Sequence, residues 1–88
     1  MKNIELREYI ESLNPSAVLF DNPSFDNSII GISTSGNIVY DLELMIEELA
    51  NDDNIPYDDA ADFISYNTVR ALPYITEGDK PIICDKNL

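Results

Sequence analysis

The side chains of this sequence that could take part in chemistry are mainly carboxylates. The chain has 17 Asp and Glu residues, 5 Lys and Arg residues and no histidine. Its densest acidic stretch is 52-DDNIPYDDAADF-63, and carboxylate oxygens are ligands that calcium prefers. Counted from Asp52, a calcium-binding EF-hand loop requires glycine at the sixth position and glutamate at the twelfth, where Tyr57 and Phe63 stand. The spacing therefore predicts no calcium site.

The sequence also lacks the usual residues for catalysis and cofactor binding. Without histidine the chain cannot build a Ser-His-Asp or Cys-His arrangement, and the single Cys84 cannot build a zinc site. No glycine-rich phosphate-binding motif occurs among its 3 glycines. We therefore predict no catalytic residue, no metal ligand and no cofactor, and a protein that is not an enzyme. The alternative is a carboxylate enzyme with a bound metal, which requires several carboxylates to converge on one cation.

The segment 66-YNTVRALPY-74 is the most distinctive stretch of polar and aromatic residues. Asn67, Thr68 and Arg70 could form a recognition site there. We prefer a local interpretation, in which Asn67 bonds backbone groups at a helix end and Arg70 pairs with acidic neighbours. Cys84 is interpreted as a buried apolar residue, since no histidine is present to activate its thiol.

The charge of the chain restricts its partners. The net charge is −12, and no basic residue occurs between Arg7 and Arg70. A negative field repels phosphate, so we expect no direct contact with nucleic acid or an anionic membrane. Solubility alone would explain such acidity; the sharper prediction is a surface that binds a basic protein partner. The residues predicted to form that surface are Glu43, Glu47, Glu48, Asp52, Asp53, Asp58, Asp59 and Asp62.

The residues at the N-terminus predict a helix from about Asn3 to Leu13. Its apolar face would consist of Leu6, Tyr9, Ile10 and Leu13. Asn14-Pro15 would end the helix, because the residue before proline is pushed out of the helical conformation. Residues 17–20 are expected to form a short strand or a buried connector.

The next segment has the composition of a β-hairpin. Residues 28–34 and 37–40 are predicted strands, joined by the two-residue connection Ser35-Gly36. Gly31 inside the first strand indicates a bulge or the close approach of another element.

Two further helices and a last strand are predicted after the hairpin. Asp41 is expected to cap a helix that carries its apolar residues at Leu42, Met45, Ile46, Leu49 and Ala50. A third helix begins near Pro56 or Tyr57 and ends before Pro73. Its predicted inward stripe is Tyr57, Ala60, Ala61, Ile64 and Thr68, with Phe63 beside it. Residues 81–84 are predicted to form a closing strand at a sheet edge, because the strand starts with proline.

These elements predict a single α+β domain over residues 1–88. A small antiparallel sheet of about three to four strands packs against about three helices, in the order α-(β)-β-β-α-α-β. One cysteine permits no internal disulfide, and no apolar run approaches the roughly 18 residues of a membrane span. We therefore expect a cytoplasmic protein.

The segments 28-SIIGISTSGNIVYD-41, 42-LELMIEEL-49, 55-IPYDDAADFISYNTVRALPY-74 and 81-PII-83 resemble a family of short uncharacterised proteins of bacteriophages and prophages. That family shows a strand with a central glycine, a Tyr-Asp pair entering a helix, and a helix of the pattern YxxAxxFxxxN. Pro56 departs from the family, in which Ser or Thr often caps the third helix. The resemblance implies a viral or mobile-element origin, with the host cytoplasm as location, but no agreed activity.

The combined prediction is a non-catalytic acidic accessory protein of a phage or mobile element. It would bind a basic host or phage protein, as a nucleic-acid mimic that inhibits a nucleic-acid-binding partner. The alternative is a structural or assembly module, or a homodimer joined along a sheet edge or apolar helix face, in which acidity serves solubility alone.

Overall fold

The computed structural model describes residues 2–76 and 78–86, and its centre is a mixed sheet of three strands. β1 (Ile29–Ile32) pairs antiparallel with β2 (Ile38–Asp41), and β2 pairs parallel with β3 (Ile82–Cys84). The order β1-β2-β3 confirms the α+β class and the edge position of the last strand. The prediction of an antiparallel sheet is wrong for β3. The chain crosses back over the helices before it reaches β3, and such a crossover delivers a parallel strand.

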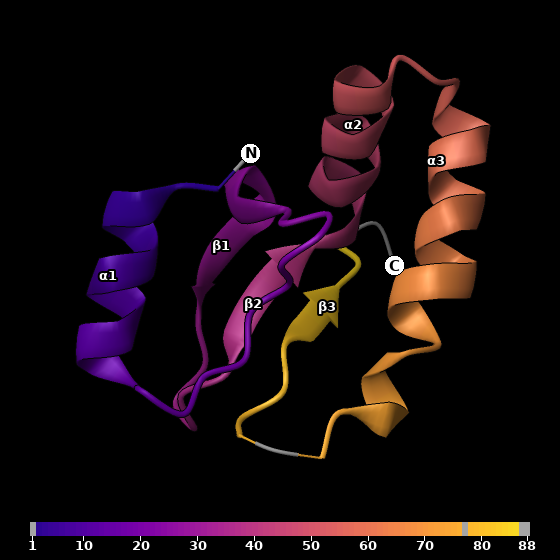
Figure 1. Ribbon diagram of the computed structural model, residues 1–88. Coiled ribbons are helices and arrows are strands. Elements are labelled where there is room, and N and C mark those ends of the chain that lie inside the picture. The colour runs from indigo at the N-terminus through magenta and orange to yellow at the C-terminus, as the bar shows by residue number, and fades with distance from the viewer. Residues whose placement is uncertain (1, 77, 87–88) are drawn as a thin grey trace.

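The helices lie on two sides of this sheet. Their bounds are α1 (Ile4–Leu13), α2 (Leu42–Asp53) and α3 (Tyr57–Phe63), with short turns η1 (Asp26–Ser28), η2 (Ile64–Val69) and η3 (Leu72–Tyr74). In Figure 1, α1 lies beside β1 at one side of the molecule, and α2 and α3 lie together at the other. The predicted element order is therefore confirmed. The segment 17–20 is a connector, and its Ala17 forms an isolated parallel β-bridge with Asp79.

The core is small and is built around β2 and α2. Met45, Ile46 and Leu49 are buried, as the helical spacing predicts. They pack with buried residues of the other elements, namely Ile10, Phe25, Ile38, Tyr40, Ala60 and Ile64. Burying a large apolar side chain stabilises the fold by about 1.5–3 kcal/mol, so these few positions supply much of its stability.

The hairpin connection is longer than the predicted Ser35-Gly36 turn. β1 ends at Ile32 and β2 begins at Ile38, so residues 33–37 form the connection. The amide of Ser33 donates to the carbonyl of Asn37 at 2.8 Å and closes it. Gly36 has φ +92°, and a Cβ there would meet Asn14 Nδ2 at 2.5 Å, so both conformation and space require glycine. The predicted irregularity at Gly31 is confirmed, because the strand register shifts between Ile29 and Gly31.

The third helix is less regular than its sequence predicts. α3 ends at Phe63 and continues as the π-helical turn η2, in which Asn67 Nδ2 donates to the carbonyl of Phe63 at 3.1 Å. The local role predicted for Asn67 is therefore confirmed. Arg70 lies over the ring of Tyr66, 4.6 Å from its centroid, a contact that the prediction of an acidic partner did not include.

The inward stripe predicted for this helix is correct in part. Its members Ala60, Ile64 and Thr68 are buried. Tyr57, at the open first turn, is exposed, and so is Phe63, which turns toward α2 instead of the sheet.

The predicted cap of α2 is confirmed. Asp41 is buried, its Oδ1 accepts from the amide of Leu44 at 3.0 Å, and its Oδ2 lies 2.9 Å from Lys86 Nζ. The hydrogen-bonded ammonium of Lys86, followed by the amide of Leu44, lowers the pKa of Asp41. Because the pKa of Asp41 is lower in the folded than in the unfolded state, its ionised carboxylate stabilises the fold above the usual aspartate pKa. This stabilisation is lost as pH falls through the pKa that Asp41 has in the folded state.

We therefore expect Asp41→Ala to destabilise the fold at neutral pH and to matter least in acid. Urea denaturation at pH 7 and at pH 3 measures this, with Asp41→Asn as the variant that keeps a cap but loses the ion pair. The denaturation midpoint should fall in the order wild type, Asp41→Asn, Asp41→Ala at pH 7. A loss for Asp41→Ala that is equally large at pH 3 would contradict this account.

Candidate functional site

A cleft of about 450 Å³ lies between the segment 21–25 and the C-terminal half of α2. Its charged wall is formed by Asp21, Glu48, Asp52 and Asp53. The ring of Phe63, at the end of α3, supplies an apolar border. We call this hollow the acidic cleft. It joins residues from four separate parts of the chain, since Lys2 also lines it.

The geometry of α2 determines which carboxylates face the acidic cleft. Glu48 and Asp52 are four residues apart and therefore share one helical face. Between them Leu49 is buried in the core, which fixes the rotation of the helix. Glu48 is also held from the side, since the hydroxyl of the buried Ser28 donates to its Oε1 at 2.8 Å.

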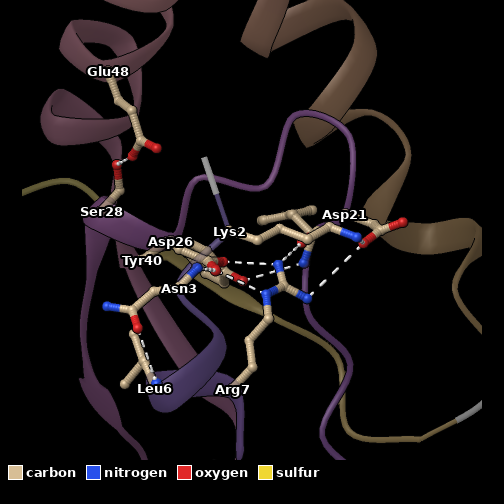
Figure 2. Close-up of polar contacts among 10 residues, drawn as sticks. Lys2, Asn3, Leu6, Arg7, Asp21, Asp26, Ser28, Tyr40 and Glu48 are labelled. Atoms are coloured by element: carbon tan, nitrogen blue, oxygen red, sulfur yellow. Dashed lines mark hydrogen bonds and ion pairs between the residues drawn. The ribbon is translucent and has the colours of Figure 1, made fainter.

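The opposite wall is held in place by a buried ion pair, which Figure 2 shows. The side chain of Asp26 is 0% exposed, and Arg7 donates to both of its oxygens, from Nε at 2.8 Å and from Nη2 at 2.7 Å. Arg7 Nη2 also donates to the carbonyl of Phe20 at 2.6 Å, and the amide of Asn3 donates to Asp26 at 2.6 Å. These bonds tie α1 to both ends of the segment 20–26, and the bond to Asp26 raises the pKa of Arg7.

The backbone of this wall has an unusual conformation at Phe25. Phe25 has φ 53°, in the left-handed region that non-glycine residues seldom adopt. Its ring is buried and meets the ring of Phe20 edge-on, with centroids 5.9 Å apart. Burial of the ring offsets the cost of the backbone conformation. Phe25 thereby anchors the wall beside Ser24.

Ser24 is the polar group of the acidic cleft that the sequence did not reveal. The residue is 6% exposed, and its hydroxyl forms no hydrogen bond within residues 2–76 and 78–86. A buried hydroxyl without a partner costs about 1–3 kcal/mol, so Ser24 is a polar group that the wall of the cleft leaves unsatisfied. Serine is too common in loops for its type or spacing to have indicated this role.

The structure divides the eight acidic residues predicted to bind a partner. Glu48, Asp52 and Asp53 line the acidic cleft. A second set, Glu43, Glu47 and Asp58, lies near Tyr57. Desolvation, followed by the charges of Glu43, Glu47, Asp85 and Asp58, raises the pKa of the Tyr57 phenol. Asp59 and Asp62 are exposed on the outer face of α3. Asp21 joins the cleft from a loop that the sequence did not connect with α2.

Three of the five basic residues that could have neutralised the predicted surface are engaged with other acids. Lys2 pairs with Asp21, Arg7 with Asp26, and Lys86 with Asp41. The ammonium of Lys2 lowers the pKa of Asp21 and compensates its charge at the rim of the cleft. The negative potential of the cleft therefore comes chiefly from α2.

Comparison with protein-family models, with curated proteins and with solved structures finds no match to this chain. The resemblance to a phage family therefore stays a prediction, and the site must be interpreted from its own chemistry.

That chemistry favours binding of a cationic group. Carboxylates and an acceptor hydroxyl suit an ammonium or guanidinium group, and an aromatic border can stack on either. Within the part of the chain that the structure describes, no three carboxylate or thiol side chains form a group able to hold a metal ion. In the same residues, no helix is both long and apolar enough to cross a membrane.

Proposed function

We propose that this protein is a non-catalytic binding module that engages a basic partner protein through the acidic cleft. The observation that carries the proposal is the position of Glu48, Asp52 and Asp53 around a concave site that also contains the buried hydroxyl of Ser24. A concave site with few polar groups and an apolar border is the usual form of a binding pocket. Lysine or arginine side chains of the partner would enter the cleft.

More specifically, we propose that the protein mimics nucleic acid. Carboxylates along α2 and at the start of α3 present negative charge over a continuous stretch of chain, as a phosphate backbone does. A protein that normally binds phosphates would meet this surface with its own Lys and Arg residues, and its binding site would be blocked. Origin in a phage or mobile element is consistent with such an inhibitor and stays a prediction.

The test is to measure binding of a fluorescent arginine-rich peptide by anisotropy, with variants matched in charge. One variant carries Glu48→Gln, Asp52→Asn and Asp53→Asn in the acidic cleft. The other carries Glu5→Gln, Glu8→Gln and Glu11→Gln on the exposed face of α1. We expect the cleft variant to bind about tenfold more weakly than the α1 variant, because a specific site loses more than a uniform field does. Binding should also weaken as salt rises from about 0.1 to 1 M.

Equal losses in the two variants would refute the acidic cleft as the binding site. The acidity would then act only through net charge, as the solubility interpretation requires. Circular dichroism of both variants checks that the fold is kept. Gln at position 48 retains the side-chain oxygen that accepts from Ser28, so the packing of α2 should be preserved.

A further inference from the structure

The acidic cleft contains a cation that belongs to the chain itself. Lys2 forms part of its lining, and the ammonium of Lys2 pairs with the carboxylate of Asp21, which also lines the cleft. Figure 2 shows these two side chains meeting. A site suited to the cationic groups of a partner therefore already holds an internal cation at its rim.

The backbone next to Lys2 is fixed, so its ammonium stays within reach of the acidic cleft. The amide of Asn3 donates to the buried Asp26 at 2.6 Å. Asn3 Oδ1 accepts from the amide of Leu6 at 3.1 Å as the cap of α1. A tethered group competes with a free ligand as though it were present at high local concentration. Lys2, one residue before this anchor, is placed to be such a competitor.

The pair between Lys2 and Asp21 can be displaced, because both partners face solvent. The side chain of Lys2 is 47% exposed and that of Asp21 is 71% exposed. Exposed ion pairs contribute little to stability, and the flexible stem of lysine lets its ammonium leave without movement of the backbone. The pair of Arg7 with the buried Asp26, which holds this wall of the cleft, would stay intact.

Arg7 is not placed to take over Asp21 when Lys2 leaves. Its Nη1 lies 3.9 Å from Asp21 Oδ1, which is longer than a hydrogen bond. Arg7 is also committed to Asp26, since it donates to both carboxylate oxygens through Nε and Nη2. Departure of Lys2 would therefore leave the carboxylate of Asp21 available to a group that enters the cleft.

We propose that Lys2 is an internal competitor that occupies Asp21 and lowers the affinity of the acidic cleft for its basic partner. A lysine or arginine of the partner displaces the ammonium of Lys2 and pairs with Asp21. Asp21 is thereby a further binding residue of the cleft, beyond the eight acidic residues that the sequence indicated. The inference rests on the proposed function, because it concerns the same site.

Anisotropy with the fluorescent arginine-rich peptide tests this competition, using two variants that each remove one positive charge. Lys2→Met removes the competitor and keeps an unbranched side chain. Lys80→Met is the control, because Lys80 is exposed and lies beside the hairpin connection, where its carbonyl accepts from Asn37 Nδ2 at 2.9 Å. We expect Lys2→Met to bind the peptide about two- to fivefold more tightly than Lys80→Met, the largest factor that an exposed ion pair supplies.

Asp21→Asn separates competition from a general effect of charge. If Lys2 acts by occupying Asp21, the advantage of Lys2→Met over Lys80→Met disappears when both variants also carry Asp21→Asn. The four proteins form a double-mutant cycle that measures this coupling. An advantage that persists in the Asp21→Asn background would overturn the inference, because Lys2 would then act through its charge alone.

The ion pair itself is measured without the peptide. The ammonium of Lys2 is the main cause of the lowered pKa of Asp21, so NMR titration should show this pKa rising toward its ordinary value in Lys2→Met. An unchanged pKa of Asp21 would mean that Lys2 does not occupy it. Circular dichroism checks that each variant keeps the fold.

Failure of this inference can be told apart from failure of the proposed function. Equal peptide affinities of Lys2→Met and Lys80→Met would remove the competitor but leave the function standing, as long as neutralising Glu48, Asp52 and Asp53 still weakens binding more than the α1 variant does. Equal losses in the cleft and α1 variants would remove the acidic cleft as the binding site, and the role of Lys2 with it.

Discussion

Replacing Arg7 with methionine is expected to lower the free energy of unfolding by about 3–5 kcal/mol. Arg7 is the only ionic partner that the structure shows for Asp26 within the described residues 2–76 and 78–86. The side chain of Asp26 is fully buried, so Arg7→Met leaves an uncompensated charge in the interior. It also removes the bond from Arg7 to the carbonyl of Phe20. A domain of this length has only about 4–13 kcal/mol of stability, so the loss is a large fraction of the total.

Urea denaturation followed by circular dichroism measures this loss. Lys2→Met is the matched control, since it breaks the exposed ion pair to Asp21 and should cost at most about 1 kcal/mol. The double variant Arg7→Met with Asp26→Leu should recover part of the stability, because it removes the stranded carboxylate as well. If Arg7→Met is no worse than Lys2→Met, the pair does not hold the segment 20–26 in place.

The fold is expected to lose about 2–3 kcal/mol of stability between pH 10 and pH 12 through the ionisation of Tyr40. Tyr40 is fully buried, and burial raises the pKa of its phenol to about 12. In the unfolded chain the phenol titrates near its ordinary pKa of about 10. The folded state therefore holds the proton more tightly, so the contribution to stability is complete below pH 10 and disappears as pH rises through 12.

Tyr40→Phe separates this effect from other alkaline changes. The variant loses the hydroxyl that accepts a hydrogen bond from the amide of Phe20 at 3.1 Å. Loss of this hydrogen bond should lower the free energy of unfolding by about 1–3 kcal/mol at neutral pH. Its stability should nevertheless fall less steeply above pH 10 than that of the wild type. Urea denaturation at intervals from pH 8 to 12 gives both quantities. Parallel pH profiles for the two proteins would show that Tyr40 does not titrate with a raised pKa.

Several features of the fold could be predicted because they depend on neighbouring residues in the chain. The cap at Asp41 and the buried positions Met45, Ile46 and Leu49 follow from helix geometry, in which residues three or four apart share a face. The bond from Asn67 to the carbonyl of Phe63 is another local contact of this kind. Each such feature was confirmed.

The acidic cleft could be predicted only in part. The spacing of Glu48 and Asp52 places both on one face of α2, but nothing in the sequence indicates that the segment with Asp21 and Ser24 faces them. That arrangement depends on Arg7 and Asp26, which are 19 residues apart and belong to no recognisable motif. Contacts of this kind depend on the path of the chain, which local patterns do not determine.

By itself, the sequence determined the acidity of this protein, its α+β class, the order of its elements, the cap of α2 and the apolar faces of its main helices. Those properties come from composition and from interactions over a few residues, where backbone geometry leaves little choice. Only the tertiary structure decided that β3 runs parallel to β2, that Asp26 is buried against Arg7, and that Tyr9 and Leu13 stay exposed. Each of these depends on how distant segments share one small core, which has too little volume to bury every apolar face that the sequence provides.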